Sequence, residues 1–512
     1  MKNYKDKIVK KKNLLKILGS YPRKKGNKVS MCHGVFDLVH PGHIRHLQFA
    51  KTKSNILVVS ITADLHVNKA DMRPYVPQQL RAENLAALEF VDYVIIDEEP
   101  NPLLNLKYLK PDFFVKGREY VSGKINPKTL DEINILKSYG GKFIYTPGDF
   151  IMSSSKIIEN DNPDLSKEKL LNLMDGENLS FNDIEKTLKN LGKIPVFVLG
   201  DSIIDTYVNT SLLGSNAKTP TFSTRYIDHI EYIGGAAIIA NHLKSAGADV
   251  TFCSILGNDK LGKKIKKNLI KNKIKDETIT INDRPTTEKK YFISDNYRLL
   301  KVDTIDNSPI SDEIIKLISE KIRKFKKGIV IFSDFRHGIF HKKSIPSFTL
   351  SICKDILKIA DSQLASRWGN ILDYQSFDLI TPNEKEVRFA LADQDTTIRP
   401  LASELYIKAK CKYLIVKMGS KGLITLRREL KNNDIRSFFV IDALEKNSID
   451  PVGCGDALLA YASLALYYSK NIVIASIIGS MSAAIESKIN GNLPIKLDKV
   501  LDKVKELKNK TI

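Results

Sequence analysis

Residues 33–43, HGVFDLVHPGH, place three histidines and one aspartate within eleven residues. His40 and His43 stand three residues apart where a predicted strand passes into a predicted helix, so both imidazoles face the first helical turn. Pro41 suits the first position of a helix, and Gly42 lets a ligand approach the backbone closely. A helix N-terminus offers free N–H groups and a positive dipole end. The segment therefore predicts a nucleoside triphosphate site, where imidazoles would stabilise developing charge.

Two other interpretations of these histidines stay open at this point. A zinc site would need a third protein ligand, for which His33 and His46 are the candidates, although no carboxylate or cysteine pattern accompanies them. Alternatively, the histidines serve only the packing of the domain.

Residues 450–466, DPVGCGDALLAYASLAL, contain a second arrangement suited to phosphate chemistry. The backbone N–H groups of Gly453, Cys454 and Gly455 can form an anion hole for a terminal phosphate. Asp456 could then accept the proton of an attacking alcohol. The alternative is an acidic residue that only interacts with the helix dipole.

These candidate sites lie in a chain whose strand-like and helix-like segments alternate. KVSMCHGVF, NILVVSITA and VDYVIID are typical of buried strands, and helical patterns separate them. Alternation of this kind indicates parallel strands, so the fold class is α/β with two doubly wound domains. We expect a basic extension over residues 1–27, a first domain over residues 28–160, a polar linker with short helices over residues 161–193, and a second domain over residues 194–512.

The composition narrows the classes of function. Lysine and arginine total 80 against 59 acidic residues, a formal charge of +21. This charge raises the alternative of a basic nucleic-acid-binding protein, which is the non-enzyme interpretation. The lysines are instead spread along the chain as on a solvated surface, and no nucleic-acid-binding motif accompanies them. The five cysteines form no C-x-x-C pair, which fits a reducing cytoplasm. The longest apolar run, residues 472–485, is too short to span a membrane and predicts a buried helix.

The first domain resembles the HxGH nucleotidyltransferases over about residues 28–158, through HGVFDLVHPGH followed by MRP, LRAENLAALEFVDYV, DFFVKGREY and MSSSKII in the family's order. The resemblance implies a Rossmann-like fold and attack of a substrate phosphate on the α-phosphate of a nucleoside triphosphate, with His40 and His43 as catalytic residues. The nucleotide-binding residues that it implies are Lys28, Phe36, Asp37, Gly42, Arg73, Lys116, Ser153, Ser154 and Ser155.

A competing assignment comes from the class I aminoacyl-tRNA synthetases, which pair an H-x-G-H motif with a lysine loop that KMGSK at residues 417–421 superficially matches. In those enzymes both motifs flank one catalytic sheet. Here KMGSK falls in the second α/β series, so we do not favour this assignment.

The second domain resembles the ribokinase-like (PfkB) carbohydrate kinases over about residues 194–507, through GDSIIDTY, GGAAIIANHLKSAG, SILGNDKLG, ITPNEKE, KMGSKG and VGCGDA. The resemblance implies Asp456 as catalytic base, Asn383 and Glu386 as organisers of Mg²⁺ through water, and a β-lid that makes a homodimer contact. It implies that Asp201, Asp205, Gly234 and Gly235 bind sugar and that Lys417, Gly419, Gly422, Gly453, Cys454 and Gly455 bind ATP.

Together the two domains resemble the family of bifunctional enzymes of ADP-heptose synthesis, with the domain order reversed. Ile238 and Gln363 depart from that family in the sugar pocket, which bears on the identity of the sugar. We expect a sugar kinase joined to a sugar 1-phosphate nucleotidyltransferase, with Mg²⁺ and ATP in both and CTP as the alternative nucleotide in the first. A cytidylyltransferase for an alcohol or polyol phosphate is the alternative function.

Overall fold

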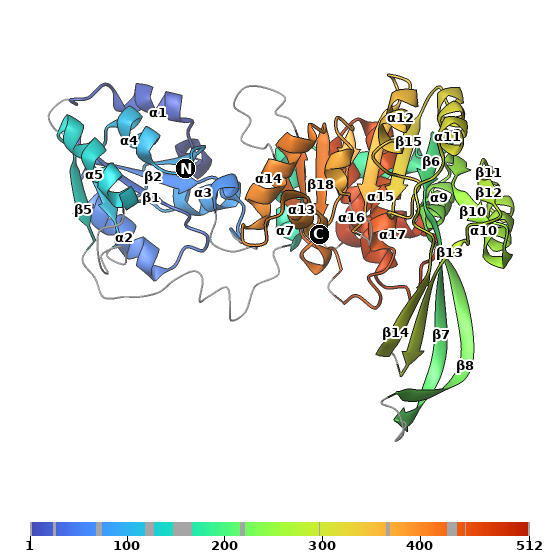
Figure 1. Ribbon diagram of the computed structural model, residues 1–512. Coiled ribbons are helices and arrows are strands. Elements are labelled where there is room, and N and C mark those ends of the chain that lie inside the picture. The colour runs from blue at the N-terminus through green and yellow to red at the C-terminus, as the bar shows by residue number, and fades with distance from the viewer. Residues whose placement is uncertain are drawn as a thin grey trace. The chain divides into compact units, whose positions relative to one another are not determined.

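The computed structural model describes residues 3–23, 27–67, 74–117, 127–146, 166–215, 221–295, 297–364, 369–427, 438–445 and 447–509. The chain forms two compact units, Met1–Leu165 and Ser166–Ile512, each with its own sheet and core (Figure 1). Both units are α/β, as the alternating sequence pattern predicts.

The first unit is built on a parallel sheet of five strands in the order β3-β2-β1-β4-β5. The winding direction of the sheet reverses between β1 and β4, and ligands of such sheets bind at the carboxyl ends of the strands at this point. Its elements are η1 (Tyr4–Lys7), α1 (Lys11–Leu18), β1 (Val29–Gly34), α2 (Pro41–Lys51), β2 (Ile56–Thr62), η2 (Asp64–His66), α3 (Gln78–Ala86), β3 (Tyr93–Asp97), α4 (Leu103–Leu109), β4 (Phe113–Lys116), α5 (Pro127–Tyr139) and β5 (Lys142–Tyr145).

The segment that we predicted as an N-terminal extension is part of this unit. Leu14 and Leu18 of α1 are buried in a core cluster with Met31 of β1 and Phe114 of β4. Just before α1, the N–H of Val9 donates to a carbonyl of β3. Two leucines four residues apart give α1 an apolar stripe, which is why the basic segment packs onto the sheet.

The predicted linker contributes two helices to the second unit. They are α7 (Ser166–Gly176) and α8 (Phe181–Lys189), and α8 begins with a capping box between Ser180 and Asp183. Leu170, Ile184 and Leu188 are buried in the same core cluster as the central strands of the second unit. The structure therefore places these helices in that core.

The second unit contains a sheet of nine strands in the order β11-β9-β6-β15-β16-β17-β18-β19-β20, parallel except at β18-β19-β20. Its strands are β6 (Pro195–Gly200), β9 (Asp249–Cys253), β11 (Lys275–Asp276), β15 (Ile329–Asp334), β16 (Leu357–Ser362), β17 (Leu379–Ile380), β18 (Tyr413–Lys417), β19 (Leu423–Arg427) and β20 (Phe438–Ile441), with β10 (Ile255–Gly257) paired to β12 (Ile279–Ile281).

Helices cover both faces of the nine-stranded sheet. They are α9 (Ala236–Ser245), α10 (Lys260–Lys271), α11 (Asp312–Lys324), α12 (Ser344–Ser351), α13 (Glu384–Leu391), α14 (Ile398–Ala409), α15 (Cys454–Ser469), α16 (Ile472–Glu486) and α17 (Leu497–Asn509), with η4 (Ile371–Asp373) and η5 (Gly419–Lys421) in loops.

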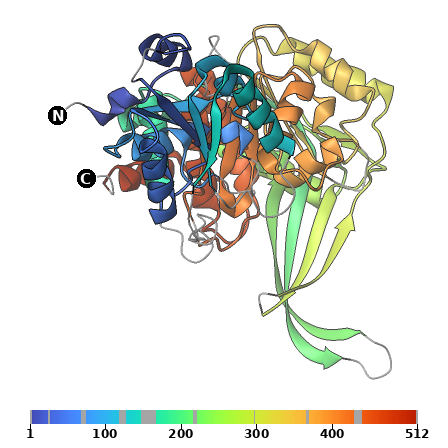
Figure 2. The same ribbon diagram turned by 90° about the vertical axis from the view of Figure 1, so that its left-hand side faces the viewer.

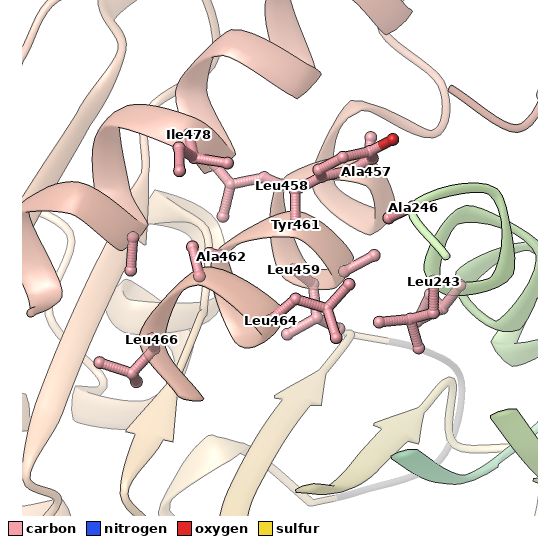
Figure 3. Packing of buried hydrophobic residues seen from close by; sticks show 14 of the residues in the cluster. Leu243, Ala246, Ala457, Leu458, Leu459, Tyr461, Ala462, Leu464, Leu466 and Ile478 are labelled. Atoms are coloured by element: carbon pink, nitrogen blue, oxygen red, sulfur yellow. The ribbon is translucent and has the colours of Figure 1, made fainter. Parts of the chain in front are cut away.

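Helix α15 lies at the centre of this unit. Figure 3 shows Leu458, Leu459 and Leu464 of α15 packed among side chains that include Leu243 of α9 and Ile478 of α16. Helix α16 confirms the buried helix expected over residues 472–485. Within the described part of the chain, no helix has both the length and the apolar character of a membrane span.

A separate four-stranded sheet, which we call the lid, has the order β14-β13-β7-β8. Its strands are β7 (Ser202–Ser215), β8 (Phe222–Gly235), β13 (Thr287–Ser294) and β14 (Tyr297–Thr304). Both ribbon views show the lid projecting from the body of the second unit (Figures 1 and 2). The lid is the β-lid that the resemblance to the carbohydrate kinases implies.

Candidate active sites

The histidine motif lies at the carboxyl end of β1, on the edge of the sheet where a ligand is expected. His40 is the N-cap of α2, and the N–H of Gly42 donates to its Nδ1 over 3.1 Å. The imidazoles of His40 and His43 stack with ring centres 3.9 Å apart. His43 Nδ1 lies 3.1 Å from the Leu38 carbonyl, to which it can donate only as the Nδ1–H tautomer or as imidazolium. The structure brings the two predicted catalytic histidines together at a helix N-terminus.

The loop between β1 and α2 is held in an unusual backbone conformation. Phe36 has a φ of 49°, which costs a non-glycine residue about 1 kcal/mol or more, and its ring packs 5.0 Å from that of His43. Asp37 is buried and accepts a hydrogen bond from the N–H of Val76 over 2.8 Å. Asp37 therefore shapes the loop around the histidines.

Arg81 of α3 positions this loop, and our sequence analysis missed it. Its side chain is fully buried and donates to the carbonyls of Val35, Thr62 and Val76, and to the carboxylate of Asp64. The guanidinium of Arg81 is thus hydrogen-bonded to the loop after β1, to the end of β2 and to the segment before α3. The available signal was an arginine in the buried stripe of α3, four residues before Leu85.

The other nucleotide-binding residues predicted in the first unit differ in their position relative to the histidine motif. Lys116 ends β4 beside the histidine motif, and its ammonium binds Glu132 over 2.6 Å. Lys28 precedes β1 and lies at the opposite edge of the sheet, about 20 Å from the motif at 3.3 Å per strand residue. The structure therefore does not bring Lys28 together with the histidine motif. Arg73 and residues 153–155, the three serines, lie outside the described residues.

The zinc interpretation finds no ligand set in the described part of the first unit. His33 Nδ1 lies 3.0 Å from the Ser60 hydroxyl, and His46 Nδ1 lies 2.6 Å from the Thr146 hydroxyl. Burial lowers the pKa of His33 to about 3 and that of His46 to about 4, so both imidazoles are neutral. Among the described residues no group of three or more histidine, cysteine, aspartate or glutamate side chains could hold a metal ion.

The phosphate turn of the second unit is formed by the start of α15. Gly453 is its N-cap with a φ of 85°, and a Cβ atom there would overlap the Asn492 side chain, so only glycine fits. Cys454 and Gly455 begin the first turn, where backbone N–H groups point along the helix axis. Asp456 follows in the same turn, 8 % exposed. The predicted anion hole and the predicted base therefore adjoin one another.

Burial dominates the electrostatics of Asp456. Removal from water and the nearby Asp361 carboxylate raise its pKa to about 7, although Lys417 opposes this shift. A carboxyl group with a pKa near neutrality can accept a proton from an alcohol and release it to solvent afterwards.

Lys417, which we assigned to the adenine nucleotide, lies at the phosphate turn. Its Nζ would stand 3.3 Å from a Cβ atom on Gly455, and it binds both carboxylate oxygens of Asp361 over 2.8 and 3.0 Å. Burial lowers the pKa of Lys417, but Asp361 and Glu386 outweigh this effect and raise it above the usual value. The ammonium is therefore charged and lies beside the first turn of α15. Asp361 is a second residue that our sequence analysis missed.

Asn383 and Glu386, expected to organise Mg²⁺, form the capping box at the start of α13. Glu386 accepts from the N–H of Asn383 over 2.7 Å and from its side-chain amide over 2.6 Å. Burial raises the pKa of Glu386 to about 7, against the influence of Lys417. Each carboxylate oxygen keeps one lone pair, which could accept a hydrogen bond from a water bound to a cation.

The predicted sugar-binding residues gather where the lid joins the body. Asp205 of β7 is buried, and a Cβ atom on Gly234 would overlap its carboxylate. Asp201 accepts from the N–H groups of Phe335 and His337 over 2.9 and 3.2 Å, so one of its oxygens holds the loop after β15. Gly235 is the N-cap of α9.

Gly419 is the first residue of the turn η5 between β18 and β19, and Gly422 is its C-cap. The turn follows Lys417 directly, on the same edge of the sheet as the phosphate turn of α15. This position is compatible with the nucleotide role expected for both glycines.

Residues 195–488 match the pfkB family carbohydrate kinases. The chain belongs to the pfkB family of carbohydrate kinases. A second match, to the cytidylyltransferase-like family, covers residues 31–160. This pfkB-family chain therefore joins a carbohydrate kinase domain to a nucleotidyltransferase domain that precedes it, in the order inferred from the sequence.

Among curated relatives of this pfkB-family chain, the Bifunctional protein HldE of Campylobacter jejuni strain RM1221 is 26 % identical over 333 residues, which cover 62 % of this chain and 67 % of that protein. The Bifunctional protein HldE of Pelobacter propionicus is 35 % identical over 139 residues, 27 % of this chain and 28 % of that protein. The protein of the same name from Campylobacter fetus is 42 % identical over 120 residues, 23 % and 26 % of the two chains.

Solved structures share the fold of the pfkB family with this chain. Phosphofructokinase-2 from Escherichia coli in complex with substrates and products has a TM-score of 0.52 at 16 % identity, covering 62 % of this chain and 99 % of that one. The same enzyme in complex with potassium gives a TM-score of 0.51 at 16 % identity, with the same coverage.

Proposed function

We propose that this chain is a bifunctional enzyme of nucleotide-activated sugar synthesis. Its second unit phosphorylates a heptose-phosphate-like sugar with ATP, and its first unit transfers a nucleotidyl group, preferably adenylyl, to a sugar 1-phosphate and releases pyrophosphate. The observation that carries the proposal is the pair of phosphate sites, His40 with His43 on α2 and the turn of residues 453–456 on α15, each inside its own unit. The name of the HldE relatives, bifunctional protein, supports the combination.

In the kinase reaction, Asp456 would accept the proton of the sugar hydroxyl as its oxygen attacks the γ-phosphate of ATP. The N–H groups at the start of α15 and the ammonium of Lys417 stabilise the negative charge on the transferred group. We propose that Mg²⁺ is held by the phosphates and by waters that Asn383 and Glu386 orient, and that it neutralises phosphate charge.

In the nucleotidyl transfer, an oxygen of the sugar phosphate attacks the α-phosphate of the nucleotide, the bond to the β-phosphate bridging oxygen breaks, and pyrophosphate leaves. His40 and His43 stabilise the charge that develops on these phosphates, and the N-terminus of α2 adds its dipole. We also propose that both reactions take place in the cytoplasm, because all five cysteines are free thiols.

Two assays on the intact protein with Mg²⁺ test the proposed function. The first measures ADP formed from ATP with a panel of sugars and sugar phosphates that includes heptose 7-phosphate. The second measures pyrophosphate released from ATP or CTP with a panel of sugar 1-phosphates. We expect ADP with a sugar phosphate and pyrophosphate with ATP. No turnover in either assay would contradict the proposal.

A second candidate rests on the match of residues 31–160 to the cytidylyltransferase-like family. It is cytidylyl transfer from CTP to an alcohol or polyol phosphate. Pyrophosphate release with CTP and glycerol 3-phosphate or a pentitol phosphate, and none with ATP, would favour this candidate over adenylyl transfer.

We further propose that two copies of the chain pair through their lids. The lid carries large apolar side chains that are exposed to solvent: Leu212, Leu213, Phe222, Tyr226, Ile227, Ile230, Tyr297, Leu300 and Val302. A concentration of this kind on one projecting sheet is typical of a protein interface, and a second lid offers the complementary apolar surface.

Sedimentation equilibrium tests the pairing of lids. The protein is expected to sediment as a dimer, and Phe222→Lys with Ile227→Lys should shift it to the monomer because two charges would be buried in the interface. Ile270→Lys is the matched control, since Ile270 of α10 is equally exposed outside the lid. A double lid variant that stays dimeric would refute the interface.

A further inference from the structure

One face of α10 carries a row of exposed lysines. Gly262, Ile265 and Leu269 are buried on the side of this helix that packs against the second unit. On the opposite side, lysines recur at spacings of three, four and four residues, which places them on one face of the helix. All of them are exposed, and among the described residues none of their ammonium groups has a hydrogen bond or an ion pair. They are Lys260, Lys263, Lys267 and Lys271.

Positive charge is concentrated in this part of the chain. Residues 260–277, from the start of α10 to the residue after β11, contain eight lysines and two acidic residues, a net charge of +6 against +21 for all 512 residues. One acidic residue, Glu277, accepts from Lys321 of α11 over 2.5 Å and lies 3.1 Å from Lys275 of β11. The other, Asp276, accepts from the N–H and the hydroxyl of Thr278. Neither acidic side chain pairs with a lysine of α10, so the exposed face of this helix keeps its charge.

Two large apolar side chains lie exposed beside these lysines. Ile270 of α10 is 73 % exposed and follows Lys267 by three residues, so the two side chains are neighbours on the helix surface. Leu317 of α11 is 49 % exposed, and the exposed Lys324 lies two turns further along the same face. The ion pair of Glu277 with α11 joins the two helices through β11, and Figure 1 shows α10, β11 and α11 at one end of the second unit. This surface therefore combines unpaired positive charge with exposed aliphatic side chains.

Nucleic acid, acidic protein and anionic phospholipid are the polyanions that could neutralise such a surface. Surfaces that bind nucleic acid commonly add aromatic side chains for stacking on bases and arginine for bidentate contact with phosphate, and α10 contains neither. Lysine is depleted in the buried centre of protein interfaces, where its ammonium would lose water. At an anionic bilayer, lysines stay hydrated among the headgroups while Ile270 and Leu317 can reach the acyl chains. Both features of the surface therefore fit a lipid partner best.

We propose that α10, β11 and the exposed side of α11 form a docking surface that binds reversibly to membranes rich in anionic phospholipid. The lysines contact the headgroup phosphates, and the two aliphatic side chains enter the boundary between headgroups and acyl chains. The contact is peripheral, since no helix in the described ranges is long and apolar enough to cross a bilayer. Docking would concentrate the enzyme, and therefore its product, at the membrane surface. This inference goes beyond the proposed function and does not depend on it.

The test is cosedimentation of the full chain with two kinds of vesicle, one of phosphatidylcholine alone and one that contains about a third phosphatidylglycerol. The wild-type protein should bind only the anionic vesicles, and added salt should weaken this binding because it screens the charges. Lys263→Gln with Lys267→Gln should lower the affinity for anionic vesicles about 10- to 30-fold, the effect expected of two lysines at an anionic surface. Ile270→Gln should lower it about three- to tenfold, because an aliphatic side chain no longer enters the bilayer.

Matched controls carry the same changes elsewhere on the second unit. Lys496→Gln with Lys499→Gln removes two exposed lysines beside the first turn of α17, and Ile407→Gln replaces an isoleucine of α14 that is also 73 % exposed. Both controls should bind anionic vesicles as tightly as wild type. The docking surface is refuted if wild type binds both kinds of vesicle equally or neither, or if the α10 variants bind like their controls. Binding of polyuridylate through Lys263 and Lys267, without binding of vesicles, would assign the surface to a nucleic acid instead.

Discussion

Replacing Asp456 by asparagine is expected to lower kinase turnover by about 10²- to 10⁴-fold and to leave nucleotidyl transfer unchanged. Asparagine has nearly the same shape, so the first turn of α15 should keep its conformation. Its amide cannot accept the proton of the attacking hydroxyl. Because the first unit has its own sheet and core, pyrophosphate release by the same sample serves as the internal control.

The pH dependence of the kinase follows from the same carboxylate. Asp456 must be ionised to act as a base, and burial raises its pKa to about 7. Turnover is therefore expected to fall as the pH drops below about 7, approaching a tenfold loss per pH unit, and to level off above it. Asp498→Asn is the matched control, since Asp498 lies exposed in the first turn of α17. If the kinase kcat of the Asp456→Asn enzyme stayed within tenfold of the wild-type value, Asp456 would not be the base.

Local motifs made the cores of both sites predictable. His40, Gly42 and His43 lie within one turn of a helix, and Gly453 and Asp456 do so in the second unit, so sequence spacing determines their mutual geometry. The alternation of strands and helices predicted both α/β sheets. This pattern is also local, because it reflects contacts between segments that are neighbours in the sequence.

Residues that meet only in the folded sheet were not predictable in this way. Lys417 and Asp361 are 56 positions apart and meet because β16 and β18 flank β17. Arg81 reaches the loop after β1 from α3, across 46 positions. Lys28 shows the converse case: it lies close to the histidine motif in sequence, yet the length of β1 places it at the other end of that strand.

The helices α7 and α8 illustrate how polar composition conceals packing. The segment appeared to be a linker because charged and amide side chains dominate it. Leu170 and Met174 of α7, and Ile184 and Leu188 of α8, recur four residues apart, and these apolar side chains pack the two helices into the core.

Replacing His43 by alanine is expected to lower the kcat of nucleotidyl transfer by about 10²- to 10³-fold, with little change in the KM for the nucleotide. The imidazole is fixed by its contact with the Leu38 carbonyl, by stacking on His40 and by the Phe36 ring. A group held so firmly needs no reorganisation when charge develops on the phosphates, so its loss should affect the transition state more than the bound substrate.

A second substitution separates this catalytic role from a role in packing. In His43→Asn, the side-chain amide can still donate to the Leu38 carbonyl, but no imidazole faces the phosphates. If His43 stabilises the transition state, asparagine and alanine should be equally inactive in pyrophosphate release while both keep full kinase activity. If His43 only holds the loop, asparagine should restore most of the activity that alanine loses. Recovery of activity by His43→Asn would therefore indicate that His40 and the N-terminus of α2, and not His43, stabilise the transition state.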